Sequence, residues 1–205
     1  MAIYKNLKKA LSDIENATTL KLSISKEELP LELFQLINLE TLYIQAPKLL
    51  KLPKEMAQLD KLVTLYITAP KLDLLPKEVI YLPLLENLNL AGCQIQEFEL
   101  EVGKTPKFKT LLLNKNSLDI LPKNIEHLDQ LESLNLSDNK LTKICDKLFN
   151  LTSLQKLYLD RNKLKTISAE QIKTWKNLSL ISLDGNPFDE QTKEILQKEF
   201  NYWFE

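Results

Sequence analysis

The sequence repeats one apolar pattern at an interval of about 23 residues, and this repeat limits the chain to a small class of folds. Equivalent apolar residues recur along the chain at Ala17, Leu39, Leu62, Leu85, Phe108, Leu131, Leu154 and Leu178. Within the units the order of apolar residues is kept, and one unit reads Leu39-x-x-Leu42-x-Ile44-x-x-Pro47-x-Leu49-x-x-Leu52-Pro53-x-x-Met56-x-x-Leu59. The pattern predicts a stack of similar coils rather than one closed core.

Each unit changes its periodicity partway along. The alternation of Leu42 and Ile44 has the period of a β-strand, whereas the spacing of three between Met56 and Leu59 fits a helical or 3-10 turn. Prolines at positions 30, 53, 76 and 122 stand where such a turn begins, because the proline N–H is not needed there. We therefore expect an α/β solenoid, in which each unit contributes a short strand, a corner and a returning helical segment.

The composition excludes several classes of site. The chain has 45 leucines but only three glycines among 205 residues, too few for glycine-rich phosphate or dinucleotide loops. One histidine and two cysteines do not make a four-ligand zinc site. The formal net charge of −1 gives no electrostatic bias toward nucleic acid or a membrane surface.

These units resemble leucine-rich repeats over residues 17–188. The variant Leu121-Pro122-Lys123-Asn124-Ile125, in a unit of about 23 residues, is similar to the bacterial and Ras-group intracellular class. The resemblance implies a right-handed horseshoe with parallel strands on a concave, protein-binding face and short helical segments on the convex face.

The resemblance also implies an asparagine at the corner after each strand, where its amide would satisfy buried backbone groups. Downstream units follow the pattern with Asn116, Asn139, Asn162 and Asn186. Upstream units depart from it with Ser25, Pro47, Pro70 and Cys93. We therefore expect no continuous amide row through the first half. We also expect a stiffer corner around Pro47 and Pro70 that serves packing, with a functional role as the alternative.

Both ends of the solenoid need a cover. In residues 1–16 an apolar stripe at helical spacing predicts an N-terminal capping helix: Ile3, Leu7, Ala10, Leu11 and Ile14. In residues 189–205, Asp189 is the expected cap of a C-terminal helix that runs to about Phe204. An exposed Trp203-Phe204 docking surface is the alternative at that end.

The sequence contains no catalytic constellation. His127 stands beside core positions with no nucleophile indicated nearby, and we expect it to be an exposed polar residue. Gly103-Lys104-Thr105 resembles the end of a phosphate loop, but Phe98 stands where that motif needs glycine. Cys145 replaces the proline of Leu-Pro and is expected to be a half-buried, unreactive thiol. We expect no enzyme activity and no cofactor or metal.

The candidate binding surface is formed by strand residues that flank the inward leucines and so point to the concave face. It consists of Tyr43, Gln45, Tyr66, Thr68, Asn89, Leu112, Asn114, Asn135, Tyr158, Asp160 and Asp184. Rigid aromatic and amide groups suit a protein or peptide partner. Binding of nucleic acid would require a stripe of lysine and arginine, which this face lacks. The alternative is that tyrosine and threonine are present as good strand formers.

The expected function is a non-catalytic protein–protein interaction module. Two alternatives stay open: a bacterial effector or regulatory subunit that acts with a separate enzyme, and a structural solenoid that assembles end to end. Met1 to Ala17 has no apolar run like that of a signal peptide, so we expect a cytoplasmic location, with secretion as an effector left open. We also expect a monomer without membrane contact.

Overall fold

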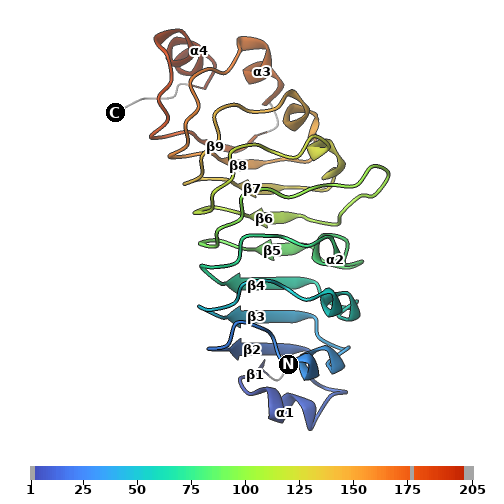
Figure 1. The fold of residues 1–205 in the computed structure, drawn as a ribbon. Helices are drawn as coiled ribbons and strands as arrows, with labels where there is room; N and C mark the ends of the chain where they lie inside the picture. Colours follow the sequence, from blue (N-terminus) through green and yellow to red (C-terminus); the bar gives the residue numbers. More distant parts are fainter. Residues whose placement is uncertain (1–2, 176–177, 201–205) are drawn as a thin grey trace.

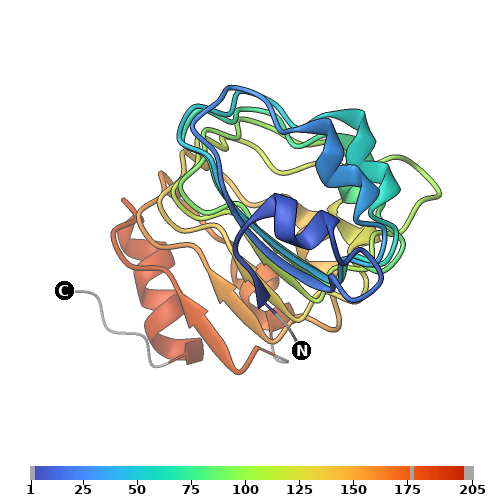
Figure 2. The same ribbon diagram turned by 90° about the horizontal axis from the view of Figure 1, so that it is seen from below.

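The computed structural model describes residues 3–175 and 178–200 of the chain. Within these residues nine parallel strands form one sheet in sequence order, from β1 to β9. Figure 1 shows the strands as successive rungs of a stack that runs from one terminus to the other. Viewed from its N-terminal end, each coil returns on the side away from the sheet, where short helical segments lie (Figure 2). The expected α/β horseshoe solenoid is confirmed.

The strands are short and evenly placed along the sequence. They are β1 Ile3–Tyr4, β2 Thr19–Ser23, β3 Thr41–Gln45, β4 Thr64–Thr68, β5 Asn87–Asn89, β6 Thr110–Leu112, β7 Ser133–Asn135, β8 Lys156–Tyr158 and β9 Leu180–Ser182. The α-helices are α1 Leu7–Leu11, α2 Lys77–Ile80, α3 Ala169–Thr174 and α4 Glu190–Phe200. The 3-10 helices are η1 Leu31–Gln35, η2 Lys54–Gln58, η3 Ile125–His127 and η4 Asp146–Asn150.

The inward leucines of neighbouring strands lie directly beside one another. Leu42 pairs with Leu65, Leu65 with Leu88, and the same register continues to Leu157 and Ile181. These side chains join the convex leucines in one continuous core. Several helical segments begin directly after proline, as expected: Pro30, Pro53 and Pro76 precede η1, η2 and α2.

The corners after the strands differ between the two halves of the solenoid. In the second half Asn116, Asn139 and Asn162 are buried, and each amide bonds backbone groups of its own and the adjoining coils. In the first half the buried Ala46 and Ala69 precede the two prolines, and strands β2 to β4 are five residues long. The expectation of an interrupted amide row is therefore confirmed.

The change of corner has a backbone cause. Strands β5 to β9 have three residues each, and a left-handed residue follows them in every unit from the fourth onward: Gly92, Lys115, Asp138, Arg161 and Gly185. A left-handed residue turns the chain out of the extended conformation and brings the asparagine inward. In the second and third units Ala46 and Ala69 stand at this position, and the proline after each of them favours an extended backbone there, so the strand continues instead.

The N-terminal end differs from the predicted single helix over residues 1–16. Ile3 and Tyr4 pair with Thr19 and Leu20 as strand β1, and Ile3 is 55% exposed rather than part of the apolar stripe. The helix is limited to Leu7–Leu11 because Asn6, in an extended conformation, accepts from Lys9 N–H and caps its start. The edge of the sheet offers unpaired backbone groups, and β1 satisfies part of them.

At the C-terminal end Asp189 acts as expected. Its carboxylate accepts from Thr192 N–H at 2.8 Å, and α4 begins at Glu190. Leu196 of α4 is fully buried against the core. Trp203 and Phe204, named above as an alternative docking surface, lie outside the described residues.

We expect Leu134→Asp to prevent folding. Leu134 is 1% exposed between the neighbouring leucines of β6 and β8. A buried unpaired carboxylate costs several kcal/mol, which is a large share of the roughly 5–15 kcal/mol that stabilises a typical domain. Circular dichroism should show loss of the folded signal. The control Thr142→Asp, at an exposed position of the same unit, should leave that signal intact. A folded Leu134→Asp protein would contradict the stacked core.

We expect Asn139→Ala to lower the free energy of unfolding by at least about 2 kcal/mol, because it leaves buried backbone groups unsatisfied. The Asn139 amide accepts from Leu118 N–H at 3.0 Å and donates to the carbonyls of Leu113 and Leu136, each at 2.9 Å. Each backbone group that loses its partner costs about 1–3 kcal/mol. Urea denaturation measures the loss, with the exposed Asn150→Ala as the matched control. Equal stability of the two variants would contradict a structural role for the amide row.

Candidate functional site

The sheet register assembles the predicted concave column residue by residue. Successive pairings join Lys21, Tyr43, Tyr66, Asn89, Leu112, Asn135, Tyr158 and Ser182. A second row, on the amino-terminal side of each strand, joins Thr19, Thr41, Thr64, Asn87, Thr110, Ser133, Lys156 and Leu180. We call the outward side chains of β2 to β9 the concave strand face. The name includes the residues two positions beyond the short strands, Asn114, Ser137, Asp160 and Asp184. Because these residues sit on paired strands, their backbone positions are fixed before any partner binds.

The N-terminal part of this face carries a stack of three side chains. The rings of Tyr43 and Tyr66 are parallel to within 7°, with centroids 4.9 Å apart. The ammonium of Lys21 lies 4.9 Å from the centroid of the Tyr43 ring. The ring spacing matches the separation of neighbouring strands, so the stack follows directly from the parallel register. Both tyrosines are half-buried and therefore still present surface to solvent.

The middle of the column contains two asparagines on either side of Leu112. The Oδ1 atom of Asn89 accepts from Ala91 N–H at 2.9 Å, and that of Asn135 accepts from Ser137 N–H at 3.0 Å. Each amide is thereby held toward the carboxyl end of its strand. Leu112 is half-buried between them, so its apolar side chain is partly covered rather than fully exposed.

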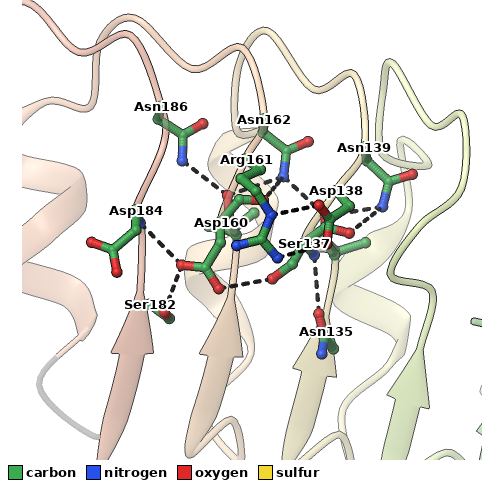
Figure 3. A network of polar contacts seen from close by, with 12 residues as sticks. Asn135, Ser137, Asp138, Asn139, Asp160, Arg161, Asn162, Ser182, Asp184 and Asn186 are labelled. Carbon is green, nitrogen blue, oxygen red and sulfur yellow. Dashed lines mark hydrogen bonds and ion pairs between the residues drawn. The ribbon is translucent and has the colours of Figure 1, made fainter.

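The C-terminal part of the face is a polar network centred on Asp160 (Figure 3). The Asp160 carboxylate accepts from Ser137 Oγ at 3.0 Å and from Ser182 Oγ at 2.5 Å. It also accepts from the backbone N–H of Asp184 at 3.0 Å. The network thus joins three consecutive coils through one carboxylate. Figure 3 shows the amides of Asn139, Asn162 and Asn186 in a row above this network.

An ion pair lies at the edge of this network. Arg161 Nε and Nη2 donate to the two carboxylate oxygens of Asp138 at 2.5 and 2.7 Å. The hydrogen bonds from Arg161 lower the pKa of Asp138, and the same contacts raise the pKa of Arg161. Both residues have a left-handed backbone conformation, with φ of 57° and 50°, and they lie at the same position of adjoining coils.

The predicted site residues therefore fall into two groups rather than one. Tyr43, Tyr66, Gln45 and Thr68 lie together on β3 and β4, and the last two are exposed. Tyr158, Asp160 and Asp184 lie together on and after β8 and β9, with Asn114 half-buried after β6. Asn89, Leu112 and Asn135 separate the two groups.

The predicted site left out five residues that take part in these contacts: Lys21, Ser137, Asp138, Arg161 and Ser182. Lys21 is in the same column as the tyrosines, and Arg161 follows Asp138 by one repeat. That spacing was a usable signal, because residues one repeat apart lie on neighbouring coils. Asn38 and Lys61, which are hydrogen-bonded at 2.6 Å, follow the same rule.

The two cysteines and the single histidine are partly or fully buried. Burial raises the pKa of both the Cys93 and the Cys145 thiol, so neither is a ready nucleophile at neutral pH. His127 is half-buried, not exposed as expected, and its Nδ1 atom has no hydrogen-bond partner among the described residues. Among residues 3–175 and 178–200, no three His, Cys, Asp or Glu side chains are grouped to hold a metal. The same ranges contain no helix with the length and hydropathy needed to cross a membrane.

Comparison with known proteins agrees with this architecture. The family model described as leucine rich repeat matches residues 129–188. A chain in the structure of the Toll–Spatzle complex from Drosophila has 26% identity and a TM-score of 0.68, and the match covers 97% of this chain and 31% of that chain. A plant ice-binding protein has 19% identity and a TM-score of 0.67, over 83% of this chain and 58% of that chain.

An internalin from Listeria monocytogenes has 18% identity and a TM-score of 0.50, over 94% of this chain and 69% of that chain. A comparison with curated proteins finds no significant match. The repeat, the fold and these likenesses together identify the chain as a leucine-rich repeat protein. This chain spans about a third of the length of the Toll-complex chain. The leucine-rich repeat fold is a typical protein–protein interaction module.

We expect the Asp138–Arg161 pair to stabilise the protein only above acidic pH. The pKa of Asp138 is lowered in the folded state, so its contribution is present above the unfolded value near 4 and is lost as the pH falls through the folded value. Asp138→Asn should therefore reduce Tm at pH 7 and make little difference near pH 2. Asparagine tolerates the left-handed backbone of this position, which separates the charge effect from strain. A Tm difference independent of pH would contradict the assignment.

Proposed function

We propose that this leucine-rich repeat protein is a non-catalytic interaction module that binds a partner protein or peptide through its concave strand face. The observation that carries the proposal is the stack of Lys21, Tyr43 and Tyr66 on a rigid parallel sheet. Tyrosine side chains have few rotatable bonds, so they give a large contact area at a low cost in conformational entropy. A stack held by the strand register is already ordered before binding.

The polar part of the face supports the same function. Asp160 already accepts three hydrogen bonds, and Asp138 is paired with Arg161. Such a network fixes the positions of hydroxyl and carboxylate groups at the C-terminal end of the same face. Interfaces with a rigid aromatic centre and a polar surround are typical of protein recognition. The Toll–Spatzle structure, similar over almost the whole of this chain, is itself a protein complex.

Further properties of the proposal come from the sequence. The repeated Leu-Pro-x-x-Ile unit favours the bacterial or Ras-group class, and we propose a cytoplasmic location. The net charge of −1, without a Lys/Arg stripe on the strands, favours a protein partner over nucleic acid. The end coils are covered by α1 and α4, which favours a monomer over an end-to-end assembly.

We expect a variant with Tyr43→Ala, Tyr66→Ala and Leu112→Ala to lose capture of the partner. Removal of a central aromatic anchor typically costs at least about 2 kcal/mol, or roughly thirtyfold in affinity. The measurement is affinity capture from native lysate, quantified by mass spectrometry, with folding of each variant verified by circular dichroism.

The matched control removes three exposed apolar side chains outside the strands, in the variant Leu31→Ala, Ile37→Ala and Leu84→Ala. It should capture the same proteins as the wild type. Equal capture by the folded concave-face variant would refute binding through this face.

A further inference from the structure

The fourth unit, residues 85–107, has no helical segment on the convex face. In the units on both sides the same repeat position is deeply buried: Val79 and Ile125 are 0% exposed and Leu148 is 1% exposed. Val102 occupies that position in the fourth unit, one repeat after Val79, and is 83% exposed. The repeat therefore places an apolar residue where a core residue belongs, and the fold turns it outward.

The local sequence explains why the turn is missing. Glu99 stands where Pro76 begins α2, and Gly103 has a φ of +78°, which ends a helical turn. The next core position of the repeat, Leu82 in the third unit, is the exposed Thr105 in the fourth. Figure 1 shows the resulting loop between β5 and β6 projecting away from the stack.

The loop is held outward by contacts with both neighbouring units. Asn124 Nδ2 donates to the Leu100 carbonyl at 3.0 Å, and Glu101 N–H donates to the Tyr81 hydroxyl. Lys104 pairs with Glu101 at 2.6 Å and lies 4.9 Å from the centroid of the Tyr81 ring. These contacts tie the loop to the third and fifth units, so they oppose the inward rotation that would bury Val102.

The missing turn leaves two apolar depressions, one on each side of Phe98. The first has a volume of about 260 Å³ and is lined mainly by Phe98, Leu100, Ile120, Leu121 and Pro122. The second has a volume of about 310 Å³ and is lined mainly by Leu74, Leu75, Ile80 and Phe98. Leu74 and Ile120, at the same repeat position in the units before and after, are 54% and 53% exposed. Apolar surface of this kind, grouped around depressions, marks an interaction site.

Two carboxylates stand on the ridge between the depressions. Glu97 and Glu99 line both of them, and within the described residues neither forms a salt bridge. Lys77, which lines the second depression, and Lys104 both pair with Glu101. Lys123 lines the first depression. The ridge thus offers negative charge to an incoming cationic group.

We propose that this convex gap binds a short basic amphipathic helix of a partner protein. Its apolar side chains occupy the two depressions beside Val102, and a lysine or arginine between them meets Glu97 and Glu99. In the rest of the convex layer each helical segment packs on its neighbour, as η1 does on η2, η2 on α2, and η3 on η4. A helical turn in the gap continues that layer between α2 and η3, and helix-in-groove binding is an established mode of peptide recognition.

The experiment selects a phage-displayed random peptide library on the folded variant Tyr43→Ala, Tyr66→Ala and Leu112→Ala, in which the concave strand face is disabled. We expect selected peptides with apolar residues at helical spacing and lysine or arginine on the same side. Synthetic copies are then measured by fluorescence anisotropy on full-length protein. The double variant Glu97→Lys and Glu99→Lys should weaken their binding at least about tenfold.

The control carries the same change of charge at exposed acidic residues elsewhere, Glu170→Lys and Glu194→Lys, and should bind as tightly as the parent. A second variant, Ile120→Asp, places a charge in the first depression and should also weaken binding. Selection of no peptide above background, or of peptides insensitive to both variants, would overturn the proposal. Binding through the concave strand face is unaffected by that result, because this selection excludes that face.

Discussion

Burial of aliphatic side chains between successive coils is the interaction on which this structure depends. One unit of the repeat places its strand and convex aliphatic residues inside a single coil, and both open sides of that coil need a neighbouring coil to cover them. Stacking in parallel register sets Leu42, Leu65 and Leu88 against one another and forms one continuous core. Regular repetition has a second effect, because the outward residues at one position of successive units also line up in a column. The core and the concave strand face are therefore two results of the same register.

The corners show how buried backbone groups are satisfied in two different ways within one solenoid. From the fifth unit onward a left-handed residue precedes an inward asparagine, and the amide bonds the carbonyls and N–H groups of adjoining coils. Pro47 and Pro70 stand at the asparagine position, where they cannot donate, and they favour an extended backbone at the preceding buried Ala46 and Ala69, so the strand is longer there. The long strands carry the tyrosine stack, and the short strands carry the Asp160 network.

Departures from the repeat are where this protein acquires distinct surfaces. Aromatic residues in two consecutive units give the stacked Tyr43 and Tyr66, which a varied column would not produce. The fourth unit loses its convex turn and gains an outward loop beside two apolar depressions. The two surfaces lie on opposite sides of the coil, so one partner could be held on the strands while a second meets the convex gap. A solenoid allows this because each unit contacts mainly its neighbours, and a local change stays local.

The sequence by itself determined the solenoid, the order and parallel register of its strands and the members of the concave column, because the strand alternation, the helical spacing and the repeat length all follow from backbone geometry. It also determined that the amide row begins only at Asn116. The tertiary structure alone decided that Ile3 and Tyr4 form a strand, that Asp138 and Arg161 are left-handed and paired, and that His127 is half-buried. Val102 is the clearest case: its repeat position predicts burial, but a neighbouring glycine and contacts with Tyr81 and Asn124 turn its loop outward. The periodicity of the sequence predicts whether a residue at a given repeat position is buried in the average unit. The actual exposure of that residue depends on the contacts that the adjoining coils make with its segment.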